Sequence, residues 1–410
     1  MNVSSRKPGA VNVRRSDVME RVAGDIREHY LSPLIDSIRN NGNALRLANM
    51  SVTLARQFGF CNGVRRAIDI AYAARRVFPE QRIFLIGEII HNPEVNRQLD
   101  GMGLQRLPWR QMDAAYDALT EDDVVIIPAF GVPIRFRRAL EEKGVSIVDT
   151  TCGDVVKVWR RVKEYAQAGI TSVIHGKANH EETIATASHA LGQDSQGHFI
   201  IVFSQKDVEM LCNYILGRGD KSEFMSHFSN AVSPGFDPDV HLRTVGMANQ
   251  TTMLKGETQQ FQQLLRASVL HRDGGSSANF HAFDTICGAT QDRQFALFEL
   301  LETPSDALFV VGGYNSSNTT HLAEIAATRQ PHTYFVSGAD CLLDLRHVRC
   351  FHLGEKRETI VELPPEAADT ARPWNVCLTA GASCPANLIE EVIRRLAELR
   401  GCAVPDTATS

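Results

Sequence analysis

The chain has 410 residues, of which 43% are hydrophobic and 22% charged, as expected for a globular protein of two or three domains. Its net charge of −5 gives no reason to expect nucleic acid or an anionic membrane surface as a partner, and no run of about 18 apolar residues predicts a membrane span. The nine cysteines are scattered and odd in number, which indicates a reducing compartment.

The first fifty residues are expected to form an N-terminal extension outside the core. Residues 1–15 are polar and basic, a composition typical of a disordered tail, and residues 18–39 have a helical pattern that Pro33 should interrupt. Acidic residues follow the basic start at once, which makes a poor transit segment. We therefore expect the protein in the cytoplasm in preference to a plastid.

From residue 51 onward, short apolar runs alternate with helical patterns, which predicts an α/β fold with parallel sheets. Three α/β units are expected, over residues 51–144, over 145–279 with an insertion near 217–241, and over 280–400, followed by a tail over 401–410. The expected strands are 52–55, 82–86, 104–107, 124–128, 145–148, 171–175, 199–203, 242–248, 280–283, 307–311, 333–336 and 375–378. The expected helices include 64–78, 93–102, 110–119, 155–168, 181–191, 206–216, 255–270, 290–301 and 385–400.

Three cysteines occupy the same kind of position, between an expected strand and the next helix. Cys61 follows the first strand, and Cys152 and Cys287 each follow an Asp-Thr-X tripeptide, which indicates a threefold internal repeat with one thiol per unit. A helix N-terminus favours thiolate, the species that binds metal. Three such thiolates would suit an iron–sulfur cluster with one open iron or a zinc site, but three separate buried cysteines fit the spacing equally well.

Four polar loops each follow an expected strand and open a helix, the position where ligands bind in parallel α/β folds. They are residues 88–95, 176–184, 310–322 and 378–388. The hydroxyl and amide groups of GGYNSSN in the third loop suit phosphate oxygens, although the same residue types are preferred helix caps. In the second loop, His180 and Glu182 could transfer a proton or could simply begin a helix.

Taken together, these segments closely resemble one family, the LytB/IspH family of 4-hydroxy-3-methylbut-2-enyl diphosphate reductases, which catalyse the last step of the non-mevalonate isoprenoid pathway. The segments that carry the resemblance are GFCNGVRRA, EIIHNPEVN, VDTTC, HGKANHEETIATAS, NQTTMLKGET, TICGATQDRQ, GGYNSSNTTHLAEI and TAGAS. They follow in family order from about residue 51 to about residue 399. The longer spellings are similar to the plant and cyanobacterial branch.

The resemblance implies a trefoil of three pseudo-threefold-related α/β units around one central 4Fe–4S cluster bound by Cys61, Cys152 and Cys287. It implies that Glu182 is the acid that delivers a proton, and that Thr251 lies near the substrate hydroxyl and relays that proton. The residues implied to bind the substrate diphosphate are His91, His180, Ser316, Ser317, Asn318 and Ser383.

The implied reaction removes the hydroxyl of a small allylic diphosphate as water, with two electrons and two protons, and yields isopentenyl and dimethylallyl diphosphate. No flavin or nicotinamide motif such as GxGxxG occurs, so the implied electron donor is a reduced ferredoxin or flavodoxin. The sequence does not predict the oligomeric state, for which a homodimer is one option. Two other functions stay open, a zinc-dependent hydrolase with a three-cysteine site and a non-catalytic iron–sulfur sensor on the same fold.

Two positions depart from the family pattern. Phe130 stands where many bacterial members have a histidine that contacts substrate, so no site role is assigned to Phe130. The plant-like branch also reads AFG here, and loss of activity is not expected. Gly153 stands where a proline often follows the cysteine. The cysteines not expected to bind metal are Cys212, Cys341, Cys350, Cys377, Cys384 and Cys402.

Overall fold

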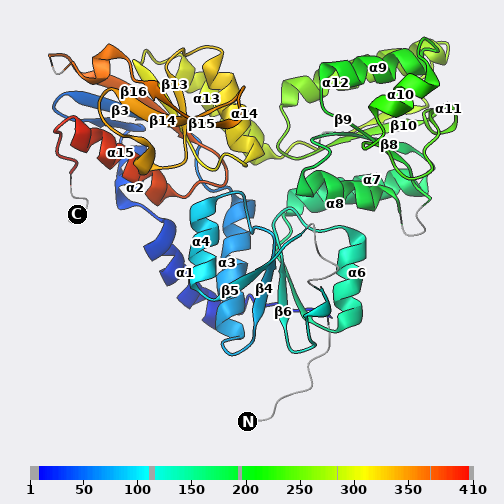
Figure 1. The fold of residues 1–410 in the computed structure, drawn as a ribbon, viewed down its shortest axis with the longest axis horizontal. Helices are drawn as coiled ribbons and strands as arrows, with labels where there is room; N and C mark the ends of the chain where they lie inside the picture. Colours follow the sequence, from blue (N-terminus) through cyan, green and yellow to red (C-terminus); the bar gives the residue numbers. More distant parts are fainter. Residues whose placement is uncertain (1–8, 110–115, 193–195, 284, 370, 406–410) are drawn as a thin grey trace. The chain divides into compact units, whose positions relative to one another are not determined.

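A computed structural model of the chain describes residues 9–109, 116–192, 196–283, 285–369 and 371–405. Its strands form three sheets with mainly parallel pairing and one antiparallel hairpin, so the expected α/β class is confirmed (Figure 1). The chain divides into two compact units. The first comprises residues 1–12, 80–87 and 104–287, and the second comprises 13–79, 88–103 and 288–410. Most of the expected helix at 110–119 lies outside the described residues.

The first unit contains a five-stranded parallel sheet in the order β1-β7-β6-β4-β5. Its strands are β1 (Gly9–Ala10), β4 (Ile83–Ile86), β5 (Leu104–Leu107), β6 (Val124–Ile127) and β7 (Ser146–Asp149). Every residue of β4 and β6 is buried, as expected for central strands of a parallel sheet covered on both faces. The helix α6 (Ile134–Lys143) connects β6 to β7.

The other sheet of the first unit has the order β11-β10-β8-β9 and is also parallel. Its strands are β8 (Thr171–His175), β9 (Phe199–Val202), β10 (Val245–Asn249) and β11 (Phe280–Ala282). Figure 1 shows helices on both faces of this sheet. On one face lie α7 (Gly153–Gln167) and α8 (Glu181–Ala190), and on the other lie α9 (Gln205–Ile215) and α12 (Lys255–Arg272).

The segment expected as an insertion near residues 217–241 contributes to the core of this sheet. It forms the short helices α10 (Lys221–His227) and α11 (Pro238–His241). Phe224, Phe228 and Phe236 from this segment are buried in the same hydrophobic cluster as the strand residue Val245. These aromatic side chains fix a segment whose sequence is otherwise rich in turn residues.

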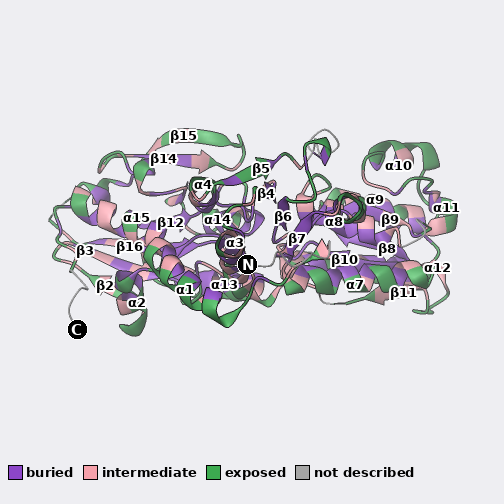
Figure 2. Ribbon diagram, turned by 90° about the horizontal axis from the view of Figure 1, so that it is seen from below, coloured by how far each residue is buried: buried purple, intermediate pink, exposed green. Residues whose placement is uncertain are grey.

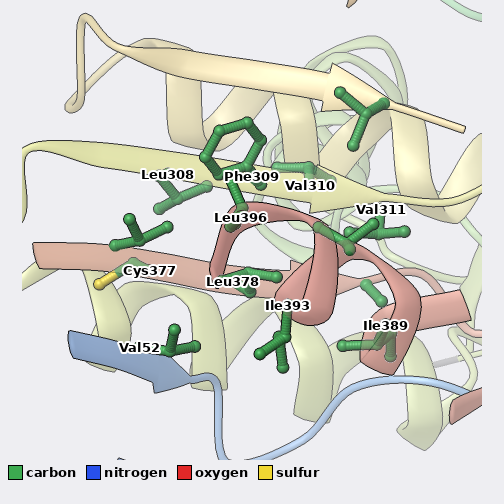
Figure 3. Packing of buried hydrophobic residues seen from close by; sticks show 14 of the residues in the cluster. Val52, Leu308, Phe309, Val310, Val311, Cys377, Leu378, Ile389, Ile393 and Leu396 are labelled. Atoms are coloured by element: carbon green, nitrogen blue, oxygen red, sulfur yellow. The ribbon is translucent and has the colours of Figure 1, made fainter. Parts of the chain in front are cut away.

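The second unit contains a sheet in the order β13-β12-β16-β3-β2, in which only the β2–β3 pair is antiparallel. Its strands are β2 (Ala44–Arg46), β3 (Met50–Leu54), β12 (Ala307–Val311), β13 (Thr333–Val336) and β16 (Trp374–Ala380). The helix α15 (Ala386–Leu399) places Ile389, Ile393 and Leu396 against this sheet (Figure 3). The remaining helices that concern the site are α3 (Asn62–Val77), α4 (Pro93–Gly101), α13 (Gly288–Leu301) and α14 (Ser317–Ala327). A hairpin of β14 (His347–His352) and β15 (Arg357–Glu362) was not expected.

The three main sheets share one strand order, although their boundaries differ from those of the expected units. Without the edge strands β1 and β2, the sheets read β7-β6-β4-β5, β11-β10-β8-β9 and β3-β16-β12-β13, and in each order the strand that leads to a cysteine stands first. The strands before Cys152 and Cys287 therefore complete the preceding sheet instead of opening a new one, and the strand before Cys61 joins C-terminal strands. The repeat predicted from the cysteine spacing is present in the topology, displaced by one strand from the boundaries at residues 145 and 280.

The first fifty residues are not a mere extension, and that expectation is wrong. The helices α1 (Ser16–Tyr30) and α2 (Pro33–Asn40) match the predicted helical segment with its break at Pro33. Leu34, Ile35 and Ile38 form an apolar stripe that is buried in the main core of the second unit. The strands β1 and β2 each extend a sheet at its edge.

Burial follows the expected pattern of a layered α/β protein. Figure 2 shows buried residues along the strands and exposed residues along the outer sides of the helices. Among the described helices, none combines the length and the apolar composition that a membrane crossing requires.

Candidate active site

Three of the nine cysteines differ from the others in position and burial. Cys61 and Cys152 are the N-cap residues of α3 and α7, and Cys287 directly precedes α13. All three are only half-buried, whereas the other six are buried. The Cys61 sulfur already accepts a hydrogen bond from the backbone N–H of Val64 at 3.4 Å, which shows how a helix N-terminus stabilises negative charge on sulfur.

The six other cysteines lie in hydrophobic surroundings. Five belong to the main core of the second unit, where Figure 3 shows Cys377 among aliphatic side chains, and Cys212 belongs to the core of the first unit. Burial raises the pKa of Cys377 to about 11 and also raises the pKa of Cys212, Cys350 and Cys384. Enclosed thiols with raised pKa values are poor metal ligands, and the absence of metal from these six cysteines stays a prediction.

Glu182 and Thr251 form a buried hydrogen-bonded pair in the first unit. Glu182 lies in the first turn of α8 and is 3% exposed, and Thr251 follows β10 and is 6% exposed. One carboxylate oxygen of Glu182 accepts the backbone N–H of Thr251 at 2.6 Å, and the other accepts the Thr251 hydroxyl at 3.0 Å. The residue predicted to supply a proton and the residue predicted to relay it are therefore in direct contact.

His180 caps the same helix that carries Glu182. Its Nδ1 accepts the backbone N–H of Glu182 at 3.2 Å, which leaves Nε2 as the protonated nitrogen of the neutral ring. The ring of Phe130 packs edge-on against the His180 ring, with centroids 6.2 Å apart. Phe130 thus supports the orientation of His180, a packing role that the family resemblance did not assign.

The Cys287 loop is attached to the loop that carries Thr251. The backbone N–H of Cys287 donates to the carbonyl oxygen of Thr251 at 3.3 Å. The hydroxyl of Thr285 bonds the side-chain oxygen of Asn249, and it also accepts the Asn249 backbone N–H at 3.2 Å. Cys287 therefore lies beside the Glu182–Thr251 pair, and the segment that leads to Cys287 is held by Asn249 at the end of β10.

Asp154 connects the two half-buried cysteines of the first unit. It lies two residues after Cys152 on α7, and its carboxylate accepts the Cys287 thiol at 3.1 Å. The same carboxylate accepts the Lys157 ammonium at 2.7 Å. Asp154 had no predicted role, and no spacing in the sequence indicated its contact with Cys287.

The Asp-Thr-Thr turn before Cys152 is held by side-chain hydrogen bonds. Asp149 accepts the backbone N–H and the hydroxyl of Thr151 at 2.9 and 2.6 Å, and it pairs with Arg137 at 2.5 Å. Burial alone would raise the pKa of Asp149, but the hydrogen bonds from Thr151 and the ion pair with Arg137 outweigh it, so this pKa is lowered. These contacts orient the residue before Cys152.

Gln250 ties the Thr251 loop to the His180 loop. Its side-chain oxygen accepts the Thr183 hydroxyl and the Lys177 backbone N–H, each at 3.1 Å. Gly176 permits this approach, because a Cβ there would lie 2.8 Å from the Thr183 hydroxyl and 2.9 Å from Gln250 Cβ. The pairing of Glu182 with Thr251 thus rests on a second set of contacts between the same two loops.

In the second unit, Cys61 is positioned by a buried arginine. Arg293 on α13 is 4% exposed and donates to the carbonyl oxygen of Gly59 at 2.5 and 3.2 Å. The backbone N–H of Cys61 donates to the carbonyl oxygen of Ala382 at 3.2 Å. Arg293 belongs to the matching segment TICGATQDRQ, but its contact with the Cys61 loop could not be inferred from sequence.

Ser316, Ser317 and Asn318 stand at the start of α14. Ser316 is its N-cap and accepts the backbone N–H of Thr319 at 3.4 Å, so the capping role weighed for this loop is present. Ser317 and Asn318 are 4% and 3% exposed, yet Ser317 Oγ and Asn318 Nδ2 find no hydrogen-bond partner among the described residues. Buried polar groups of this kind favour a bound ligand, and an anion suits a helix N-terminus.

His91 and Ser383 lie close to these residues of α14. The Ser383 hydroxyl is 3.1 Å from the carbonyl oxygen of His91 and 3.2 Å from the Ser316 hydroxyl. His91 Nδ1 lies 3.0 Å from the carboxylate of Glu88. Ser383 thus links His91 to the N-cap of α14. Asn318 on the same helix accepts the backbone N–H of Ala382, the residue before Ser383, at 2.8 Å.

The predicted site residues therefore form two connected groups, one in each unit. In the first unit they are Cys152, His180, Glu182, Thr251 and Cys287. In the second unit they are Cys61, His91, Ser316, Ser317, Asn318 and Ser383. The first group combines thiols with a proton-transfer pair, and the second combines a thiol with hydroxyl and amide donors.

Comparisons with known proteins agree with this chemistry. The family model described as LytB protein matches residues 52–397. A Synechococcus protein (strain WH7803) named 4-hydroxy-3-methylbut-2-enyl diphosphate reductase is 43% identical over 382 residues, which is 93% of this chain and 93% of that protein. A protein of the same name from Gloeobacter violaceus is 44% identical over 388 residues, 93% of this chain and 90% of that protein.

Two solved structures share the fold. One is of (E)-4-hydroxy-3-methyl-but-2-enyl diphosphate reductase, described as the terminal enzyme of the non-mevalonate pathway. It has a TM-score of 0.52 and 26% identity and covers 85% of this chain and 99% of its own. The other, the reductase from Plasmodium falciparum, has a TM-score of 0.60 and 21% identity and covers 85% and 88%. The family model and the cyanobacterial relatives both extend over most of the sequence, and the chain belongs to the LytB family.

Proposed function

We propose that this protein reduces 4-hydroxy-3-methylbut-2-enyl diphosphate to isopentenyl and dimethylallyl diphosphate, with loss of the allylic hydroxyl as water. Two electrons and two protons balance the reaction. The observation that carries the proposal is the buried contact of Glu182 with Thr251, whose backbone carbonyl oxygen also accepts the N–H of Cys287. Its relatives at 43 and 44% identity bear the name of this reductase.

The donor set fits one 4Fe–4S cluster bound by Cys61, Cys152 and Cys287. These are the half-buried cysteines, each at or next to a helix start, whereas the remaining thiols are enclosed in apolar cores. When bound, the cluster supplies single electrons and an open, Lewis-acidic iron for the substrate oxygen. A zinc-dependent hydrolase would use the same thiolates, and analysis for iron and sulfide distinguishes the two.

Glu182 and Thr251 supply the proton that the leaving oxygen needs. In its protonated form, the Glu182 carboxyl group donates to Thr251 Oγ1 while the Thr251 hydroxyl proton passes to the departing oxygen. The separation of 3.0 Å between these oxygens permits that transfer without movement of either backbone. A sensor without catalytic activity has no need for such a pair, which favours the enzyme.

The α14 residues are proposed to bind the diphosphate. Ser317 Oγ and Asn318 Nδ2 are buried donors available to anionic oxygens, and the N-terminal backbone of α14 adds the positive end of its dipole. Ser316, Ser383 and His91 lie beside them in the same unit. His180 in the first unit is proposed as the sixth diphosphate ligand, as the family resemblance implies.

The reducing electrons are proposed to come from a separate one-electron carrier protein, a ferredoxin or a flavodoxin. The sequence contains no flavin or nicotinamide motif that would supply them internally.

The experiment that tests the function uses protein purified without oxygen and dithionite-reduced methyl viologen as a chemical electron donor. We expect the substrate to be consumed and both isopentenyl and dimethylallyl diphosphate to form. The reaction is monitored by ³¹P NMR and, after dephosphorylation of the products, by gas chromatography. Iron-loaded protein that leaves the substrate unchanged under these conditions would refute the proposed reaction.

A further inference from the structure

The outer face of α7 is basic in a chain that is acidic as a whole. The helix contains four lysine and arginine cations and two carboxylates, whereas the full chain has a net charge of −5. The cations are Lys157, Arg160, Arg161 and Lys163, and all lie outside the buried stripe of the helix that includes Val158 and Val162. We call these four cations, together with Val156 and Phe283, the α7 face.

Two of the cations on the α7 face carry uncompensated charge. Lys157 pairs with Asp154, and Arg161 pairs with Glu164. Arg160 and Lys163 are exposed and have no carboxylate partner in the part of the chain that the structure describes. Unpaired surface cations attract an acidic partner over several ångströms and speed its association.

Exposed apolar side chains lie among these cations. Val156 is 38% exposed and Phe283 is 42% exposed. The guanidinium of Arg161 stacks over the Phe283 ring, 3.3 Å from its centroid, so the end of β11 and α7 contribute to one continuous surface. Few large apolar side chains are exposed among the residues that the structure describes, and exposed apolar side chains beside cations are a composition found in protein interfaces.

The α7 face is connected to two of the proposed cluster ligands. Cys152 is the N-cap of α7, and Phe283 lies four residues before Cys287. The Lys157 ammonium contacts Asp154, whose other carboxylate oxygen accepts the Cys287 thiol. A partner protein bound to this face at Lys157 would thus be connected through Asp154 to the thiol of Cys287, a proposed ligand of the redox centre.

We propose that the α7 face is the docking surface for the electron donor, an acidic one-electron carrier protein. The proposal rests on the proposed function. Each docking event delivers one electron and oxidises one donor molecule, so two events supply the two electrons of one turnover. The positive charge selects an acidic carrier, and the small apolar area fits the brief contact that repeated exchange of donors requires.

Charge reversal on the α7 face tests this surface through binding. The probe is an acidic plant-type ferredoxin, titrated by calorimetry into the iron-loaded protein at low salt. We expect Arg160→Glu with Lys163→Glu to weaken binding about tenfold, and Phe283→Ala to weaken it severalfold, with the wild-type affinity falling as salt is added. Arg160→Gln alone offers a milder change if the double variant folds poorly.

Matched controls are available near β9, the strand at the opposite edge of the same sheet from β11. Lys206 on α9 is an exposed cation, and Phe203 at the end of β9 is 42% exposed, as Phe283 is. Figure 1 shows α9 on the side of the sheet away from α7. Lys206→Glu and Phe203→Ala should leave ferredoxin binding within about twofold of wild type.

A kinetic comparison separates the docking proposal from the proposed function. We expect the α7-face variants to raise the KM for ferredoxin about tenfold and to keep the rate with reduced methyl viologen, which needs no docking surface. Ferredoxin binding and KM that stay within about twofold in these variants would overturn the docking surface while the methyl viologen rate upholds the reaction. Absence of methyl viologen activity in the iron-loaded wild type would overturn the function, and the docking proposal with it.

Discussion

The contact between Glu182 and Thr251 makes a sharp prediction about Glu182→Gln. The glutamine side chain has nearly the shape of glutamate, and its oxygen can still accept the Thr251 backbone N–H that lies 2.6 Å from the carboxylate. Its amide nitrogen would face the Thr251 hydroxyl, which can accept that hydrogen bond because a hydroxyl also has acceptor lone pairs. The loops should therefore keep their structure, but the acidic proton is lost.

The magnitude follows from this geometry. Replacing a charge-assisted hydrogen bond by a neutral one costs about 1 kcal/mol of stability, which leaves the fold intact. Loss of a positioned general acid slows the step that it serves by about 10²–10⁴-fold, or about 3–5 kcal/mol in activation free energy. We thus expect kcat to fall by at least about a hundredfold with nearly unchanged iron content.

The assay compares kcat with reduced methyl viologen for the wild type and for matched variants. Glu181→Gln is the control, because Glu181 is the neighbouring acid in the same first turn of α8, whereas both hydrogen bonds from Thr251 go to Glu182. Thr251→Ser should retain most of the activity by keeping the hydroxyl, whereas Thr251→Val should lose much of it. A Glu182→Gln enzyme within about threefold of wild type, at equal iron content, would remove Glu182 from the mechanism.

Three further predictions concern stability and the remaining thiols. Because the pKa of Asp149 is lowered in the folded state, its ionised form contributes stability above about pH 4 that is lost as the pH falls through the folded-state pKa. The deficit in unfolding midpoint of Asp149→Asn should therefore shrink between about pH 7 and about pH 3, and a constant deficit would contradict this assignment. Ile35→Ala should lower the free energy of unfolding by about 2–5 kcal/mol, because Ile35 is fully buried. Leu31→Ala is the control and should cost far less, since Leu31 is 38% exposed. Equal losses of the two variants in thermal melts would count against the burial of α2. Cys384→Ala should keep its iron, as the thiol is enclosed and its pKa is raised by burial, and loss of iron would make Cys384 a ligand.

The sequence predicted the positions of most strands and helices well, but it did not predict which strands pair with one another. Apolar runs bounded by turn residues located strands such as β8, whose expected and observed bounds coincide, because local patterning reports burial of each residue. Pairing depends on tertiary contacts, so nothing local indicated that β3 joins β16 near the other end of the chain. The hairpin of β14 and β15 was missed because its strands are only partly buried and lack a continuous apolar run.

The same limit applies to the candidate site. Family resemblance named Glu182 and Thr251, but their direct contact arises from two loops far apart in sequence. Arg293 and Asp154 hold the loops of Cys61 and of Cys287 through contacts of the same long-range kind. Charged residues that position a site look like ordinary helix residues until the fold brings their partners within reach.

The proposed function depends first on one iron–sulfur cluster held together by Cys61, Cys152 and Cys287. Its most direct test is iron and sulfide analysis of protein purified without oxygen, beside alanine variants of each of these cysteines and of the enclosed Cys377. We expect about four irons per chain in the wild type and in the Cys377 variant, with a loss of iron in each of the other three variants. Zinc in place of iron, or a cluster that survives replacement of Cys61, Cys152 or Cys287, would contradict it.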